Sequence, residues 1–195
     1  MYAKWITLVM TTVLIATGSL LAQPKQSNKA EQKMQNTADR SFISSTAEAN
    51  LAEIDIAKMV GQKSTDPAVK DFANRMVTDH TQASQKLASV AEMDGIKLPS
   101  EASMTQRNEK SELEKLSGTQ LDDAYVRNEL QGHKETISAF ENEIEHGHNQ
   151  EAKNYAEQTL PTLQDHIRVA ENVAGKLGLT GKTGLSDEAK AIAAK

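Results

Sequence analysis

Three histidines and one glutamate occupy positions where an apolar residue is expected. Each interrupts a series of largely apolar residues spaced by three and four, the spacing that places side chains on one face of a helix. The four interrupting residues are Glu53, His80, His133 and His166. If the four helices pack together, one carboxylate and three imidazoles share the interior.

The four series come from separate segments of the chain. They are Phe42, Thr46, Ala49, Glu53, Ile56 and Val60; Val69, Ala73, Met76, His80, Ala83 and Leu87; Val126, Leu130, His133, Ile137, Phe140 and Ile144; and Thr159, Leu163, His166, Ala170, Val173 and Leu177. Each series contains one candidate ligand, so convergence requires all four helices to meet.

The polar residues lie near the middle of their predicted helices. His80 is thirteen residues after Pro67, which corresponds to about 20 Å of helix. His133 is fourteen residues after Thr119, and the other two lie within a turn or two of the same level. We therefore expect the four side chains to meet at mid-height of a bundle.

Three neutral imidazoles and one carboxylate form a ligand set suited to Zn and compatible with Mn, Fe, Cu or Ni. If all four bind one transition metal ion, the site is closed and structural. If Glu53 does not coordinate the metal, the three histidines leave an open position for a metal-bound water. The sequence predicts one metal ion and does not choose between these forms.

Three acidic residues are candidates to support the ligands. Asp79 and Asp165 each directly precede a histidine, and a residue in that position points about 100° away on a helix. Such an aspartate can reach the imidazole of a neighbouring helix and fix its tautomer. Glu129, one turn before His133, is a further carboxylate near the predicted site.

Two other functions fit the same residues. One glutamate and three histidines can form a hydrogen-bonded polar core without metal, as in a structural or envelope-stress protein. An open metal position could instead serve a hydrolase or an oxidase. The sequence leaves these alternatives open and does not establish an enzyme.

The elements that must position these residues are helices. Aromatic residues make up only 4% of the 195 residues, the middle of the chain is rich in Ala, Glu, Lys, Gln and Leu, and strand signals are missing after residue 40. The sequence predicts an all-α fold.

The first two helices are predicted to be antiparallel neighbours. The first begins near Asp39 or Ser41, either of which can cap it, and runs to about Gly61. The second begins at Pro67 after a capping aspartate and extends to about Asp94, with Gly95 as its C-terminal cap. The short connection between them leaves no room for a crossover.

The connection over residues 96–118 carries a short helix of its own, because Ser103 and Gln106 match a capping box. This segment is either a crossover that leaves the second and third helices of the bundle parallel, as in ferritin-type bundles, or a flap on an up-and-down bundle.

The last two helices run from Thr119 to His146 and from Asn149 to Gly178. Pro161 lies inside the fourth helix, where it removes a backbone donor and clashes with the preceding turn. We expect a kink, or a break and restart, at this residue.

The chain divides into four parts. Residues 1–22 resemble a signal peptide, with a lysine before a short apolar run, and residues 23–38 are predicted to be a disordered leader. Residues 39–178 form the bundle, and residues 179–195 form a flexible tail. We expect export to the periplasm or outer envelope, with a membrane anchor only if the signal is not cleaved.

The charge of the chain excludes one class of partner. The net charge is −5, and no basic cluster with interleaved aromatic residues is present. Nucleic-acid binding is therefore not expected. Membrane contact is expected only through an uncleaved signal segment, and the sequence indicates no particular protein partner.

Several of these motifs resemble an exported bacterial family, domain of unknown function 4142. The matching pieces are Ala52-Glu53, the stretch from Phe72 to His80, Gly132-His133 followed by Phe140, and the stretch from Leu160 to His166. Members are often labelled membrane or outer-membrane proteins and are regarded as ferritin-like four-helix bundles.

The resemblance covers about residues 39–178. It implies a ferritin-like four-helix bundle, export and the set Glu53, His80, His133 and His166, but no activity. Gly132 departs from the family pattern, which has an acidic residue at this position.

Overall fold

The structure is a computed structural model that describes residues 26–179, with side chains described from residue 37. The predicted signal peptide, residues 1–22, lies outside the described residues, as does the predicted tail from residue 180 onward. Within the described range the chain forms five helices and no strand. The fold is therefore all-α, as predicted.

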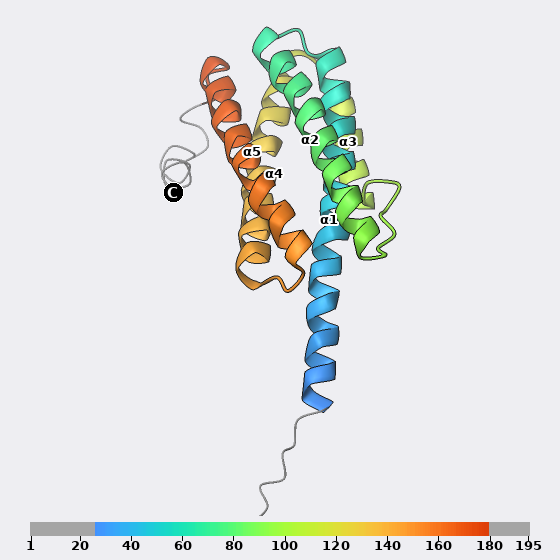
Figure 1. Cartoon of the computed structure of the whole chain (residues 1–195). Helices are drawn as coiled ribbons and strands as arrows, with labels where there is room; N and C mark the ends of the chain where they lie inside the picture. The colour runs from blue at the N-terminus through green and yellow to red at the C-terminus, as the bar shows by residue number, and fades with distance from the viewer. Residues whose placement is uncertain (1–25, 180–195) are drawn as a thin grey trace, which may run out of the picture.

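Four long helices and one short helix make up a ferritin-like four-helix bundle (Figure 1). The short helix, α3, lies between the second and third helices of the bundle, as the capping box at Ser103 and Gln106 predicted. The helices are α1 (Gln26–Lys63), α2 (Pro67–Met93), α3 (Met104–Glu114), α4 (Gly118–His146) and α5 (Gln150–Lys176).

Contacts at the two ends of the bundle decide the direction of α4. At one end, Lys63 at the end of α1 donates to the carbonyl of Glu114, just before α4 begins. At the other end, Asn149 after α4 donates to Asp94 after α2, at 2.6 Å. Since α2 and α4 begin at one end and finish at the other, they run parallel, and α3 belongs to the crossover of a ferritin-type bundle.

Local chemistry explains where α2 begins and ends. The Asp66 carboxylate accepts hydrogen bonds from the backbone N–H groups of Ala68 and Val69, and Pro67 occupies the first helical position. Gly95 follows the helix with a φ of 60°, a conformation that glycine adopts without strain. Both ends of α2 agree with the prediction.

The prediction for the start of α1 was wrong. The helix begins at Gln26, not near Asp39 or Ser41, so most of the predicted disordered leader is helical. The segment before Asp39 contains few apolar residues but many strong helix formers, which extend a helix already fixed by packing. Figure 1 shows this first part of α1 extending beyond the other helices.

Asp39 has a different role from the predicted cap. Its carboxylate accepts a hydrogen bond of 3.0 Å from the backbone N–H of His148, in the loop between α4 and α5. Asp39 therefore attaches that loop to α1.

Pro161 does not break α5. The helix is continuous from Gln150 to Lys176. Pro161 and Glu157, whose carbonyl would have bonded residue 161, are both exposed. Water can therefore satisfy that carbonyl, and the helix continues through the proline.

The helices pack most closely in two pairs, α1 with α2 and α4 with α5, and α2 also packs on α5. The contact of α1 with α4 is looser, and α3 lies beside both of them. Among the described residues, no helix is both long and apolar enough to cross a membrane.

Candidate metal centre

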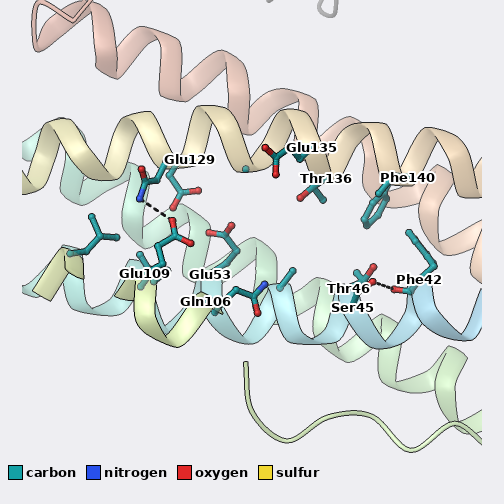
Figure 2. Close-up of a pocket in the computed structure, with 17 residues that line it drawn as sticks. Phe42, Ser45, Thr46, Glu53, Gln106, Glu109, Glu129, Glu135, Thr136 and Phe140 are labelled. Carbon is teal, nitrogen blue, oxygen red and sulfur yellow. Dashed lines mark hydrogen bonds between the residues drawn. The ribbon is translucent and has the colours of Figure 1, made fainter. Parts of the chain in front are cut away.

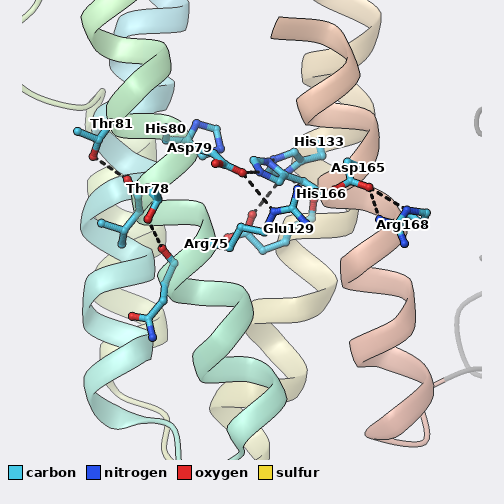
Figure 3. Close-up of polar contacts among 12 residues, drawn as sticks. Arg75, Thr78, Asp79, His80, Thr81, Glu129, His133, Asp165, His166 and Arg168 are labelled. Carbon is cyan, nitrogen blue, oxygen red and sulfur yellow. Dashed lines mark hydrogen bonds and ion pairs between the residues drawn. The ribbon is translucent and has the colours of Figure 1, made fainter.

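Three of the four predicted ligands meet in the core. His80 of α2, His133 of α4 and His166 of α5 are buried, and their ring centroids are 5.1–5.7 Å apart. Each ring offers a nitrogen, and these three nitrogens lie within 4.8 Å of one another. Figure 3 shows the three rings side by side between the helices.

The hydrogen-bond partner of His80 fixes its tautomer. Nδ1 of His80 lies 2.9 Å from the side-chain oxygen of Asn50, and the amide group of Asn50 donates to the hydroxyl of Tyr155. The Asn50 oxygen can only accept, so Nδ1 of His80 carries the hydrogen and Nε2 holds a lone pair. That Nε2 is buried and has no hydrogen-bond partner.

The other two imidazoles are fixed in the same way. Nε2 of His166 lies 2.9 Å from the Asp79 carboxylate, and Nδ1 of His133 lies 3.0 Å from the backbone carbonyl of Glu129. Both partners accept, so these two nitrogens carry the hydrogens. The lone pairs of the neutral rings are then on Nδ1 of His166 and Nε2 of His133.

These two lone pairs face each other. Nε2 of His133 and Nδ1 of His166 are 3.1 Å apart, and two acceptors cannot form a hydrogen bond. Either one of the two rings holds a second proton, or a cation binds both nitrogens. Two nitrogens bound to one tetrahedral Zn at about 2.0–2.1 Å are about 3.3 Å apart, close to the observed spacing.

The environment keeps the histidines neutral. Burial lowers the pKa of His166 to about 4, with His133 adding to the effect and Asp79 opposing it. Burial also lowers the pKa of His133, and it lowers that of His80 well below its usual value. Neutral imidazoles are the form that binds metal, and a second proton on either His133 or His166 is disfavoured.

Glu53 does not join the three histidines. Its carboxyl oxygen groups with Glu129 and His133, all within 4.8 Å of one another. The Glu129 carboxyl lies 3.3 Å from Nδ1 of His133, the ring nitrogen that does not face His166. The predicted four-ligand set is therefore divided into a three-histidine group and a glutamate pair that share His133.

The glutamate pair is unfavourably placed for ionisation. Burial raises the pKa of Glu129 to about 8, and Glu109 contributes to the rise. Burial and then the nearby Glu129 raise the pKa of Glu53 well above its usual value. Two carboxylates in one buried site repel each other, so the pair keeps a proton at neutral pH.

The two aspartates that precede histidines differ. Asp79 reaches the imidazole of a neighbouring helix, as predicted for both. Asp165 instead pairs with Arg75 and Arg168. Arg75 also bonds Asp79 at 3.2 Å and so connects the two aspartates.

Asn50 was not among the residues selected from the sequence. It lies three residues before Glu53 on α1, so the helical spacing places both on neighbouring parts of one face. That spacing was the only available signal, because an asparagine is more often exposed than buried. Its pairing with His80 depends on how α1 and α2 pack.

The family model described as "Domain of unknown function (DUF4142)" matches residues 23–173. The chain belongs to this family. No functionally curated protein matches it.

Three solved structures are similar to this DUF4142 chain. One is described as "putative secreted protein DUF305" from Streptomyces coelicolor, with 15% identity over 72% of this chain and 94% of that chain, at a TM-score of 0.61. A DUF305 fragment from Deinococcus radiodurans has 16% identity over 71% and 96%, at a TM-score of 0.63. A conserved hypothetical protein from Mycobacterium tuberculosis has 18% identity over 72% and 93%, at a TM-score of 0.58. At these identities the similarity concerns the fold.

The buried glutamates Glu53 and Glu129 make the stability of the folded domain depend on pH. Between the ordinary pKa of 4.5 and the folded value of about 8, the unfolded chain has released the Glu129 proton and the folded chain keeps it. The contribution of Glu129 to stability therefore falls as pH rises through this window. In chelator-treated protein, we expect the stability of Glu129→Gln relative to wild type to increase with pH.

Urea denaturation at about pH 5 and about pH 8.5 measures this difference. The opposite effect of His166, whose low pKa costs stability as pH falls from 6.5 to about 4, is present in both proteins and cancels. Glu141→Gln, on the exposed face of α4, is the control. A constant difference between Glu129→Gln and wild type would contradict the expected burial.

Proposed function

We propose that this DUF4142 domain binds one transition metal ion through Nε2 of His80, Nε2 of His133 and Nδ1 of His166. The supporting observation is that each imidazole commits its hydrogen to a partner on its outer side, which leaves three buried lone pairs facing inward. Outer partners of this kind commonly orient histidine ligands to metals.

The donor set narrows the choice of metal. Three neutral nitrogen donors suit Zn, Cu, Fe and Ni, whereas Mn prefers oxygen ligands. Because Glu53 groups with Glu129 and His133 and does not join all three histidines, the proposed site has three protein ligands and a free fourth position. That position would hold a water molecule.

A metal-free polar core is the main alternative. In that case His133 or His166 would hold a second proton, which would lie between Nε2 of His133 and Nδ1 of His166. The charged ring would pair with Glu129 or with Asp79. Burial opposes this state by lowering the pKa of both histidines. A catalytic role has less support, since the pocket that borders the glutamate pair is lined by neither His80 nor His166.

We also propose that the domain acts outside the cytoplasm. Residues 1–22 carry the signal-peptide pattern, and the similar protein from Streptomyces coelicolor is described as secreted. The periplasm or outer envelope remains the expected location.

Metal analysis tests the proposed site. Protein purified without a histidine tag and equilibrated with Zn should retain about one equivalent by elemental mass spectrometry. His80→Ala and His166→Ala should lose it, and His146→Ala, which removes an exposed histidine at the end of α4, should retain it. If the wild-type protein holds no metal and the His80→Leu variant is at least as stable as wild type, the result would support the polar core instead.

Substitution of Asp79 and of Asp165 tests whether the hydrogen-bond acceptor of His166 supports metal binding. Asp79→Asn weakens the acceptor for His166 and should reduce metal affinity about 10–100-fold. Asp165→Asn is a matched control, because Asp165 also bonds Arg75 but, in the described part of the chain, bonds no imidazole. Competition with a chromogenic chelator measures both affinities, and equal losses would contradict the assigned role of Asp79.

The N-terminus of the protein recovered from cells tests export. We expect an envelope fraction whose protein begins near Gln23, detected by intact mass and N-terminal peptide analysis. Full-length protein in a membrane fraction would support the uncleaved anchor. Full-length protein in the cytoplasm would contradict export.

A further inference from the structure

A pocket of about 390 Å³ opens where α1, α3 and α4 meet. It exists because α1 and α4 pack loosely along this side and the short α3 covers only part of the gap. Its volume lies in the range of sites that hold small organic ligands and is far larger than one metal ion needs.

One end of the pocket is acidic. Figure 2 shows Glu53 of α1, Glu109 of α3 and Glu129 of α4 gathered there. Among the described residues, no lysine or arginine lines the pocket. Glu109 accepts a hydrogen bond of 2.9 Å from Asn128, which holds it at this end.

A buried carboxyl oxygen at this end has no hydrogen bond. Glu129 is 5% exposed, and its Oε2 atom lies 3.3 Å from Nδ1 of His133, whose hydrogen is already donated to the Glu129 carbonyl. A buried oxygen without a hydrogen bond is unfavourable, so a donor placed in the pocket would stabilise this carboxyl group. This observation is independent of the number of acidic residues nearby.

Gly132 keeps the middle of the pocket open. It lies inside α4, its φ is not positive, and a Cβ atom built on it would meet nothing within 4 Å. Neither backbone conformation nor packing requires glycine here, although glycine inside a helix is less favourable than alanine. The unfilled space joins the acidic end to the rest of the pocket.

The other end is aromatic. Phe42 and Phe140 meet edge to face with ring centroids 5.0 Å apart and close this end of the pocket in Figure 2. The hydroxyl residues Ser45, Thr46 and Thr136 lie beside these rings. The pocket therefore combines an anionic end with an aromatic end.

We propose that this pocket binds a small organic ammonium ion with a short apolar body. Its N–H groups donate to Glu53, Glu109 and Glu129, and its body passes Gly132 toward the two phenylalanines. Ammonium donors satisfy unpaired carboxyl oxygens, and their positive charge offsets the acidic end.

A metal ion matches the same residues less well. The nitrogen of His133 on this side is Nδ1, which donates its hydrogen to the Glu129 carbonyl. It therefore has no lone pair to offer a metal, and only carboxyl oxygens remain. A ligand that supplies hydrogens fits this arrangement better than one that needs electron pairs.

Calorimetric titration of the mature chain with 2-phenylethylamine tests the proposal. We expect saturable binding of the amine and none of 2-phenylethanol, which has the same body without the charge. Glu129→Gln and Gly132→Leu should each weaken binding at least about tenfold, the first by replacing an accepting carboxyl oxygen with an amide group that donates and the second by filling the space. Gly132→Ala and Glu141→Gln are the matched controls and should bind as wild type does.

Two outcomes would overturn the proposal: no saturable binding of the amine, or equal binding of the amine and the alcohol. Thermal melting identifies any variant that does not fold, and Gly132→Leu keeps the test valid if Glu129→Gln fails. The titration is repeated with chelator and with His80→Ala. Unchanged affinity supports a site separate from the metal site, whereas loss of binding would mean that the amine had bound a metal ion.

Discussion

The structure depends on three buried imidazoles whose hydrogens are all directed outward. Asn50, Asp79 and the carbonyl of Glu129 each accept one hydrogen, and this leaves three lone pairs inside an apolar bundle. Unpaired acceptors in such a place cost stability unless something electropositive lies between them. The rest of the fold supplies the partners that maintain this arrangement.

The directions of the helices determine which polar residues meet around the histidines. The crossover through α3 sets α4 antiparallel to both α1 and α5, and this direction together with the rotation of α4 decides which neighbours His133 meets at mid-height. Arg75 of α2 bonds Asp79 and also Asp165 of α5, and Asp79 holds His166. A polar layer therefore connects the helices at the depth where a purely apolar bundle would have only packing contacts.

His133 separates two different environments. Its Nε2 faces His166, and its Nδ1 faces the backbone and carboxyl of Glu129. The histidine side offers lone pairs and suits a metal ion. The glutamate side offers oxygens that need hydrogens, and it opens into the pocket beside α3. One ring thus borders two sites of opposite hydrogen-bonding character.

The sequence by itself determined the helices, most of their ends, and the three histidines at mid-height. These features depend on local chemistry: the spacing of apolar residues, the cap at Asp66, and the glycine after α2. Its local signals failed at the start of α1, where helix formers without apolar partners extended a packed helix. Of the kink or break expected at Pro161, the break was wrong, because the proline and Glu157 are both exposed.

Only the tertiary structure decided that Glu53 pairs with Glu129 and that Asn50 orients His80. It also decided that Asp165 meets arginines instead of an imidazole. Each of these outcomes depends on the rotation of one helix against another, and the direction of α4 was equally open from sequence. Spacing along a helix fixes which face a residue occupies, but the neighbour that this face meets is set by packing between distant segments.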